Sequence, residues 1–112
     1  MVEKPTEIIL KYVAGEGLDN PEELSRNLLI LSAYLGVLGK EITEAEVAYA
    51  RKWQSERINY KTDKQAEMAL KLAPEYSVME NKKSGYRMLQ ELIRSIKKRL
   101  SVLSDDRKES IY

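Results

Sequence analysis

The chain has 112 residues, of which 43% are hydrophobic and 33% are charged, and this balance suits a single folded domain. It contains no cysteine and no histidine. Histidine is the commonest general base and metal ligand, so the composition argues against nucleophilic triads, zinc sites and disulfides. No apolar run approaches the roughly 20 residues needed to span a bilayer, and residues 1–11 lack the basic-then-apolar layout of a signal peptide. We therefore expect a cytoplasmic protein with no metal site, no cofactor and no catalytic residue.

The net charge of +1 conceals an uneven distribution along the chain. Residues 1–50 carry a net charge of −5, whereas residues 82–108 carry +6. Two interpretations are open. Either the two halves neutralise each other, within the fold or between protomers, or the basic end binds a polyanion.

A short helix is predicted over residues 6–14, within an N-terminal arm that spans residues 1–19. Thr6 is a suitable N-cap, and apolar residues follow it at helical spacing. Gly15 and Gly17 are expected to end this helix.

A long helix is predicted over residues 21–58. Asn20 is a suitable N-cap, and Pro21 suits the first helical position. Apolar residues then recur in heptad steps, which is the pattern of a helix packed along its whole length. These positions are Leu24, Leu28, Leu31, Leu35, Leu38, Ile42, Ala45 and Tyr49.

Two glycines and a second capping signal lie in the middle of this long helix. Gly36 and Gly39 weaken it locally, and Thr43 with Glu46 has the spacing of a capping box. The sequence therefore predicts a kink or a break near residues 39–43, with the kinked continuation favoured because the heptad pattern keeps its phase.

A short helix is predicted over residues 62–73. Thr62 begins it, and Gln65 stands in capping-box position. Pro74 ends it, because a proline ring clashes with the preceding helical turn.

The last long helix is predicted over residues 75–104, followed by a polar tail over residues 105–112. Lys82 interrupts its heptad seam once. The seam consists of Met79, Tyr86, Leu89, Ile93, Ile96, Leu100 and Leu103.

The predicted fold class is all-α, a single domain over residues 1–112 built as a long antiparallel helical hairpin with short flanking helices. Two long apolar seams on so small a chain also predict a coiled-coil homo-oligomer, whose number of subunits the mixed seam residues do not fix. The predicted oligomer interface consists of Leu28, Leu31, Leu35, Leu38, Ile42, Leu89, Ile93, Ile96 and Leu100.

Basic residues line one face of the last helix, away from its apolar seam. At roughly 100° per residue, Lys83, Arg87, Arg94, Lys97 and Lys98 share this face. Such a stripe can follow a phosphate backbone. The alternative is an ordinary solvated helix face, with cations favoured near a helix C-terminus.

A second candidate segment combines cations with aromatic rings. Arg51, Lys52 and Arg57 surround Trp53, and Tyr49 precedes them. Aromatic rings stack on bases while cations hold phosphates, so this mixture is typical of single-stranded nucleic-acid binding. The alternative is that the two rings belong to the core, which we favour for Tyr49 because it continues the heptad seam.

Acidic pairs offer a weak alternative function, a magnesium-dependent enzyme on a helical bundle. Glu22 with Glu23 and Glu44 with Glu46 lack a facing acidic pair on the last helix. Acidic residues are also common at helix N-termini. No enzymatic activity is therefore expected.

Three stretches of the sequence resemble small phage recombination-mediator proteins of the UvsY type. They are AEVAYARKWQSERINY at residues 45–60, TDKQAEMALKLAPEY at residues 62–76 and SIKKRL at residues 95–100. The resemblance covers about residues 24–103. The chain is shorter than the family near residues 59–62.

The resemblance implies a phage-encoded homo-oligomer, in the host cytoplasm, that binds single-stranded DNA. It also implies contacts with a strand-exchange recombinase and a single-strand-binding protein, the first being loaded as the second is displaced. The family's basic-aromatic DNA-binding segment falls on Arg51, Lys52 and Arg57. The alternative is a structural or adaptor protein, such as a phage assembly component or scaffold, that acts by self-association alone.

Overall fold

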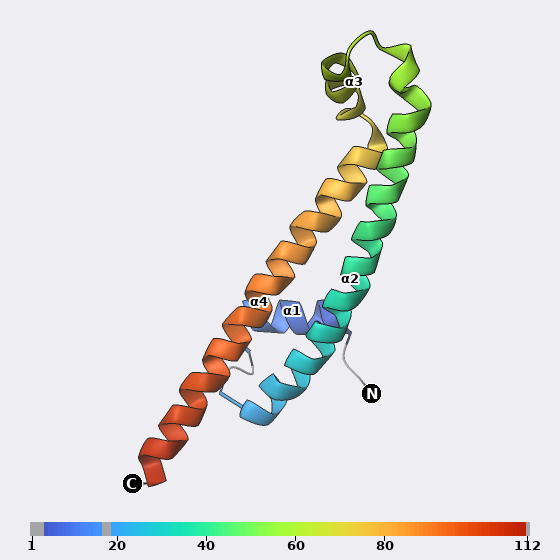
Figure 1. Cartoon of the computed structure of the whole chain (residues 1–112). Helices are drawn as coiled ribbons and strands as arrows, with labels where there is room; N and C mark the ends of the chain where they lie inside the picture. The colour runs from blue at the N-terminus through green and yellow to red at the C-terminus, as the bar shows by residue number, and fades with distance from the viewer. Residues whose placement is uncertain (1–3, 17–18, 112) are drawn as a thin grey trace. The chain divides into compact units, whose positions relative to one another are not determined.

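The computed structural model describes residues 4–16 and 19–111, and the side chains up to residue 105. Over these residues it contains helices and no strand, which confirms the all-α class. Along the chain, a short helix precedes two long helices, and another short helix lies between the two long ones (Figure 1). The elements are α1 (Pro5–Val13), α2 (Pro21–Glu56), the 3₁₀ helix η1 (Arg57–Asn59), α3 (Asp63–Leu70) and α4 (Pro74–Ile111).

The chain divides into two compact units, where the sequence pattern predicted one domain. The first unit consists of Met1–Gly36 and Met88–Tyr112, and the second of Val37–Arg87. At 1.5 Å per residue, helices as long as α2 and α4 each reach roughly 55 Å, which exceeds the diameter of one small core. Each long helix therefore contributes one segment to each unit.

Helix α1 begins at Pro5 and not at the predicted Thr6. Lys4 is the N-cap in extended conformation, and its backbone N–H donates to the Glu7 carboxylate at 3.3 Å. Proline suits the first helical position because an N–H group there would have no acceptor within the helix, so lacking one costs nothing. This places the N-cap two residues before the predicted one.

Gly15 ends α1 as predicted, through a Schellman motif. Its N–H donates to the Tyr12 carbonyl at 3.0 Å, and the Glu16 N–H donates to the Lys11 carbonyl at 2.9 Å. Gly15 has φ of +80°, a conformation that costs a residue with a Cβ atom free energy. Gly17, the second predicted terminator, lies outside the described residues.

Helix α2 begins as predicted. The Asn20 side-chain oxygen accepts hydrogen bonds from the backbone N–H groups of Glu22 and Glu23, at 3.1 and 3.2 Å. These bonds satisfy two donors that have no partner inside the helix, and Pro21 removes a third.

Helix α2 is one unbroken helix, so the favoured continuation through residues 39–43 is confirmed and the alternative of a break is not. The Thr43 hydroxyl donates to the Gly39 carbonyl at 3.2 Å, a bond back to the preceding helical turn. Thr43 is therefore an interior helix residue and does not cap a second helix.

Gly39 provides room for an aromatic ring of the second unit. A Cβ atom placed on Gly39 would lie 3.6 Å from a ring carbon of Tyr86 on α4. Nearby, the Lys82 ammonium donates to the Glu41 carboxylate at 3.1 Å. Lys82, which interrupts the apolar seam in the sequence, thus takes part in the contact between α2 and α4 through an ion pair.

Helix α3 has the predicted start but ends at Leu70, three residues before the predicted end. Thr62 accepts a hydrogen bond from the Gln65 N–H at 3.1 Å, and the Gln65 side chain accepts one from the Lys61 N–H at 3.3 Å. The N–H groups of residues 72 and 73 bond to carbonyls three residues earlier, which tightens the chain into a turn ahead of Pro74.

Helix α4 begins at Pro74, one residue before the predicted start. It continues to Ile111, so the predicted polar tail is helical over residues 105–111. That stretch contains neither glycine nor proline, the residues least compatible with a helix interior.

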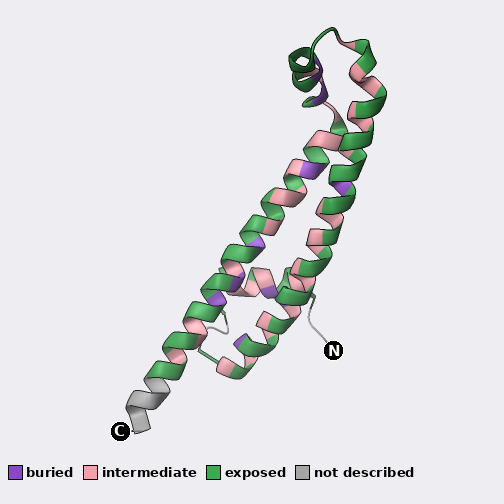
Figure 2. Ribbon diagram, in the orientation of Figure 1, coloured by how far each residue is buried: buried purple, intermediate pink, exposed green. Residues whose placement is uncertain are grey.

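The core of the first unit is formed by aliphatic side chains from all three of its helices. Leu31 on α2 and Ile96 on α4 are fully buried, with 0% exposure. Buried positions are purple on the ribbon in Figure 2. Tyr12 on α1 adds a polar contact, since its hydroxyl lies 2.8 Å from that of Ser95 on α4. The buried set is Ile8, Leu24, Leu31, Leu89, Ile93 and Ile96.

The core of the second unit is smaller and built from smaller residues. Ala45 of α2 and Met79 of α4 are buried, as are Ala66 and Leu70 of α3. Two of these four side chains are alanines, so this unit removes less apolar surface from water than the first.

The structure places the predicted oligomer interface in two environments. Leu31, Leu89, Ile93 and Ile96 are buried in the chain's own core. The other five are only half-buried and retain exposed apolar surface. They are Leu28, Leu35, Leu38, Ile42 and Leu100. Self-association through this seam stays a prediction, and it rests on the second group.

We expect Ile96→Ala to lower the free energy of unfolding by about 2–5 kcal/mol, because it leaves a cavity in a closed core. Urea unfolding followed by circular dichroism measures this change. Met88→Ala is the control, since Met88 is 72% exposed on the same helix and its loss should cost under about 0.5 kcal/mol. Equal effects of the two substitutions would contradict the burial described here.

Gly36→Ala should stabilise the protein by about 1 kcal/mol, because a Cβ atom there meets no atom within 4 Å and alanine is the better helix former. Gly15→Ala should destabilise it, because φ at Gly15 is positive. Thermal unfolding of both variants tests the pair, and a lower melting temperature for Gly36→Ala would be the contrary result.

Candidate nucleic-acid interface

Three predicted contact residues lie together on α4 in the first unit. Arg94, Lys97 and Lys98 are exposed, and their positions at i, i+3 and i+4 place them on one helix face. Ile93 and Ile96 point into the core. Because these buried residues fix the rotation of the helix about its axis, the three cations face solvent.

The cations of this face differ in how they are paired. Arg94 donates to the Glu91 carboxylate at 2.6 Å, and both side chains are largely exposed. Within the described part of the chain, no hydrogen bond or ion pair involves the ammonium of Lys97 or Lys98. Exposed pairs contribute only about 0–1 kcal/mol, so a phosphate can compete with Glu91 for Arg94.

The remaining stripe residues belong to the second unit. Arg87 is exposed, and its Nε donates to the Lys83 backbone carbonyl at 3.4 Å. Lys83 is half-buried. Arg87 therefore offers a guanidinium to solvent, while Lys83 presents less of its side chain.

Lys52 of the predicted basic-aromatic segment is paired within its own helix. Its ammonium lies 2.7 Å from the Glu56 carboxylate, one helical turn further along α2. A hydrogen bond to Glu56, together with the charge of that carboxylate, raises the pKa of Lys52. The charge of Lys52 is thus partly neutralised before any ligand arrives.

The aromatic residues of the same segment contact each other. The Trp53 indole N–H donates to the Tyr49 hydroxyl at 3.2 Å. The Tyr49 ring in turn lies against the Tyr76 ring of α4, with centroids 5.3 Å apart. Trp53 and Tyr49 are both half-buried. This arrangement favours the core interpretation of both residues over the base-stacking one.

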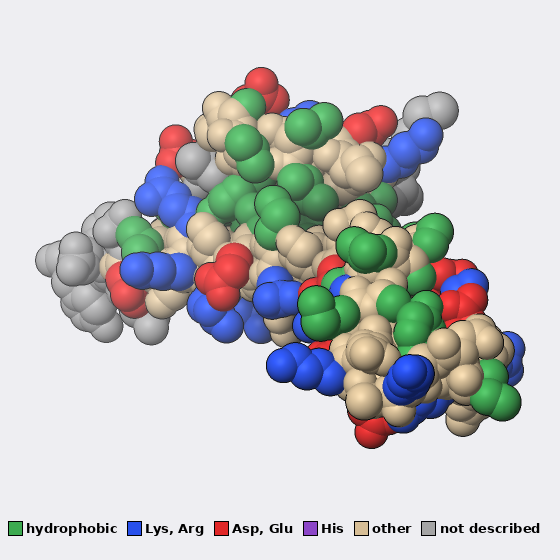
Figure 3. All heavy atoms as spheres, turned by 90° about the horizontal axis from the view of Figure 1, so that it is seen from above, with side chains coloured by type: hydrophobic (Ala, Val, Ile, Leu, Met, Phe, Trp, Pro, Cys, Tyr) green, Lys and Arg blue, Asp and Glu red, His purple; other side chains and the backbone are tan. Residues whose placement is uncertain are grey.

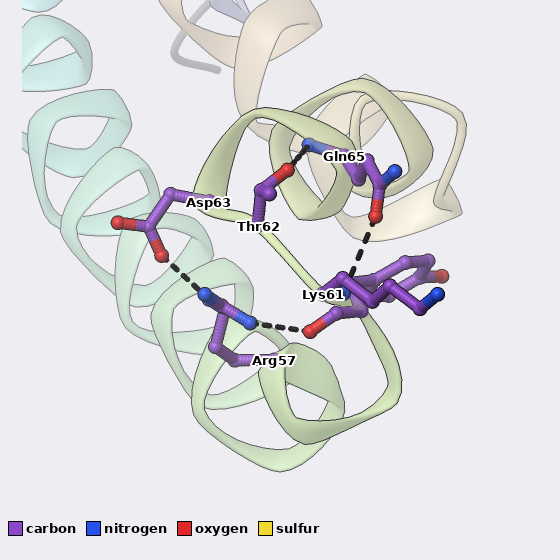
Figure 4. A network of polar contacts seen from close by, with 6 residues as sticks. Arg57, Lys61, Thr62, Asp63 and Gln65 are labelled. Carbon is purple, nitrogen blue, oxygen red and sulfur yellow. Dashed lines mark hydrogen bonds and ion pairs between the residues drawn. The ribbon is translucent and has the colours of Figure 1, made fainter.

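Arg57 braces the turn that follows α2 (Figure 4). Its Nε donates to the Asp63 carboxylate at 2.6 Å, and its Nη1 donates to the Tyr60 carbonyl at 2.7 Å. Two nitrogen atoms of the Arg57 guanidinium are therefore engaged in hydrogen bonds within the protein. Arg51 of the basic-aromatic segment is exposed, and among the described residues no hydrogen bond or ion pair involves its guanidinium.

Sequence reasoning missed the carboxylates that neutralise three of the predicted cations. Glu56 and Glu91 stand four and three residues from their partners, a spacing that the sequence already displays. Asp63 reaches Arg57 across a turn, so no helical spacing points to that pair.

Two other properties of the described residues bear on function. They contain no group of three or more aspartate or glutamate side chains placed to hold a metal ion. None of their helices combines the length and the apolar character needed to cross a membrane.

Comparison with protein-family models, curated proteins and solved structures found no match to this chain.

Proposed function

We propose that this chain is a non-enzymatic protein that binds single-stranded DNA through the cation face of α4 in the first unit. The observation that carries the proposal is that Lys97 and Lys98 are both exposed while Ile93 and Ile96 on the same helix are buried. At roughly 100° per residue, Lys98 lies opposite the buried pair and Lys97 lies at the flank of the buried stripe. Lysines held in this way can contact phosphates without any change in the core. Binding of this kind releases counterions, so its affinity falls as salt rises.

The mode of binding would be insensitive to base sequence. Trp53 and Tyr49 contact neighbouring side chains, which disfavours base stacking on them. Ammonium and guanidinium groups on phosphates position a strand without reading it. Bases left exposed on such a strand remain available to a second protein.

This property suits a recombination mediator, which is the role that the resemblance to UvsY-type proteins implies. A mediator would hold the strand by its backbone while a recombinase takes over the bases and a single-strand-binding protein leaves. The resemblance over residues 24–103 supports this part of the proposal, together with the all-α hairpin.

A structural or adaptor protein is the second candidate. The first unit exposes Leu10 and Val13 on α1 and Leu29 on α2, each at least 70% exposed. Exposed apolar side chains of this kind favour contacts with other proteins. Self-association without any affinity for oligonucleotides would select this candidate.

We expect Lys97→Glu with Lys98→Glu to weaken binding of a fluorescein-labelled oligothymidylate at least tenfold at low salt, because two phosphate contacts become repulsive. In Lys97→Gln with Lys98→Gln, the slope of log affinity against log salt should fall by about 1.4, or roughly 0.7 for each lost contact. Fluorescence anisotropy at several salt concentrations measures both effects.

The matched control is Arg26→Glu with Lys40→Glu, which changes the net charge equally on α2, where both residues are exposed. This variant should bind almost as well as the unaltered chain. If the unaltered chain does not bind at low salt, the DNA function is wrong. If both charge reversals weaken binding equally, the assignment of the site to α4 is wrong.

Asp63→Asn tests whether Arg57 contributes to binding, as the sequence resemblance implies. Loss of the carboxylate frees the guanidinium, and since an exposed pair is worth up to about 1 kcal/mol, affinity should rise up to roughly fivefold. Glu44→Gln removes one exposed negative charge from the same unit and serves as the control. Equal affinities of the two variants would place Arg57 outside the interface.

A further inference from the structure

The segment from η1 to the end of the α3 turn exposes three large aliphatic side chains. Ile58 is 86% exposed, Met68 is 66% exposed and Leu72 is 87% exposed. Ile58 and Leu72 are the most exposed of the large hydrophobic residues that the structure describes. Side chains that are this exposed do not contribute to the core of the second unit.

Helical spacing explains how part of this surface is arranged. Ala66 and Leu70 of α3 are fully buried. Lys64, Met68 and Leu72 follow one another at steps of four residues, which places them on one face, away from the buried pair. The Leu72 N–H bonds to the Ala69 carbonyl at 3.1 Å, so the helical path extends past the end of α3. Ile58 belongs to η1, which contacts α3.

The charges of the same segment are unbalanced in favour of cations. Its two acidic residues are both paired, Asp63 with Arg57 at 2.6 Å and Glu67 with Lys71 at 3.4 Å. Lys61 is exposed, and in Figure 4 its ammonium lies away from the Arg57–Asp63 pair.

Lys64 is exposed as well, and among the described residues no ion pair involves either lysine. Hydrophobic side chains and Lys or Arg side chains lie next to one another at the α3 end of the second unit in Figure 3. We call Ile58, Lys61, Lys64, Met68 and Leu72 the tip surface.

We propose that the tip surface docks an acidic segment of another protein, one that carries large apolar side chains between its carboxylates. The two unpaired lysines select negative charge, and the three aliphatic side chains require apolar surface in return. A nucleic acid supplies the charge but not the apolar partner, and aliphatic side chains do not provide the aromatic stacking that binds bases. A polypeptide supplies both.

The tip surface is also held ready for a partner. Thr62 and Gln65 cap α3, and Arg57 ties η1 to the first turn of α3 through Asp63. A surface that is fixed before binding loses less conformational entropy on association. The flexible Met68 side chain allows the apolar part to adapt to its partner.

Selection of displayed random 12-residue peptides on the immobilised full chain tests the proposal. The enriched peptides should carry a net negative charge and at least two large apolar residues. A labelled synthetic copy of one of them should bind at least tenfold more weakly to the triple variant Ile58→Ser, Met68→Ser, Leu72→Ser. It should bind at least threefold more weakly to Lys61→Glu with Lys64→Glu.

The matched control is the triple variant Val37→Ser, Val47→Ser, Val78→Ser, which removes exposed apolar side chains from the same unit and should leave peptide binding unchanged. Circular dichroism confirms that each variant is folded. Failure to enrich peptides, enrichment of uncharged or basic peptides, or equal binding by the tip variant overturns the proposal.

Two further measurements test whether the tip surface binds a nucleic acid or a membrane instead of a protein. Oligothymidylate affinity should be the same in the unaltered chain and the tip variant, and a loss in the variant would assign these residues to nucleic acid instead. The unaltered chain and the tip variant should sediment equally with vesicles of phosphatidylcholine and phosphatidylserine. Sedimentation that depends on Ile58, Met68 and Leu72 would identify a membrane surface as the ligand and overturn the docking of a protein.

Discussion

The burial of the aliphatic stripe of α4 in the first unit is the interaction on which the candidate site depends. Ile93 and Ile96 lie in the core with Leu31 of α2. Helical side chains radiate at fixed angles, so a buried stripe determines what the opposite face presents. Lys97 and Lys98 therefore need no contacts of their own to be held outward. Core packing therefore orients the DNA-binding face that we propose. A less tightly packed core would let α4 rotate, and the lysines would no longer hold one direction.

Carboxylates near the cations set how strongly this protein attracts anions. Arg57 and Arg94 each hold an exposed acidic partner, and such contacts are weak enough to exchange for a phosphate. With 19 basic and 18 acidic residues, the net charge of the chain is close to zero. A basic stripe in the sequence thus overstates the positive potential that the folded chain presents, because it counts charges and omits their neighbours.

Local signals in the sequence predicted three of the helix boundaries correctly. The Asn20 cap, the Thr62 cap and the Gly15 terminator all act through atoms within a few residues. Some local signals are compatible with more than one structure. Thr43 has the spacing of a capping residue, but in the continuous α2 its hydroxyl donates to the Gly39 carbonyl one turn earlier. The candidate site was only partly predictable, since helical spacing reveals the partner of Arg94 but not that of Arg57.

The contact between Lys82 and Glu41 has a consequence for how the second unit finds its alignment. Seams that repeat every seven residues look alike after a shift of one repeat, so apolar packing alone leaves the register of two long helices degenerate. A polar pair occurs at one position only. With Lys82 against Glu41 and the Tyr86 ring beside Gly39, a shifted hairpin would lose an ion pair and press the ring against a larger residue. The interruption in the heptad pattern, together with the Gly39–Tyr86 contact, thus favours one alignment of the α2 and α4 segments within the second unit.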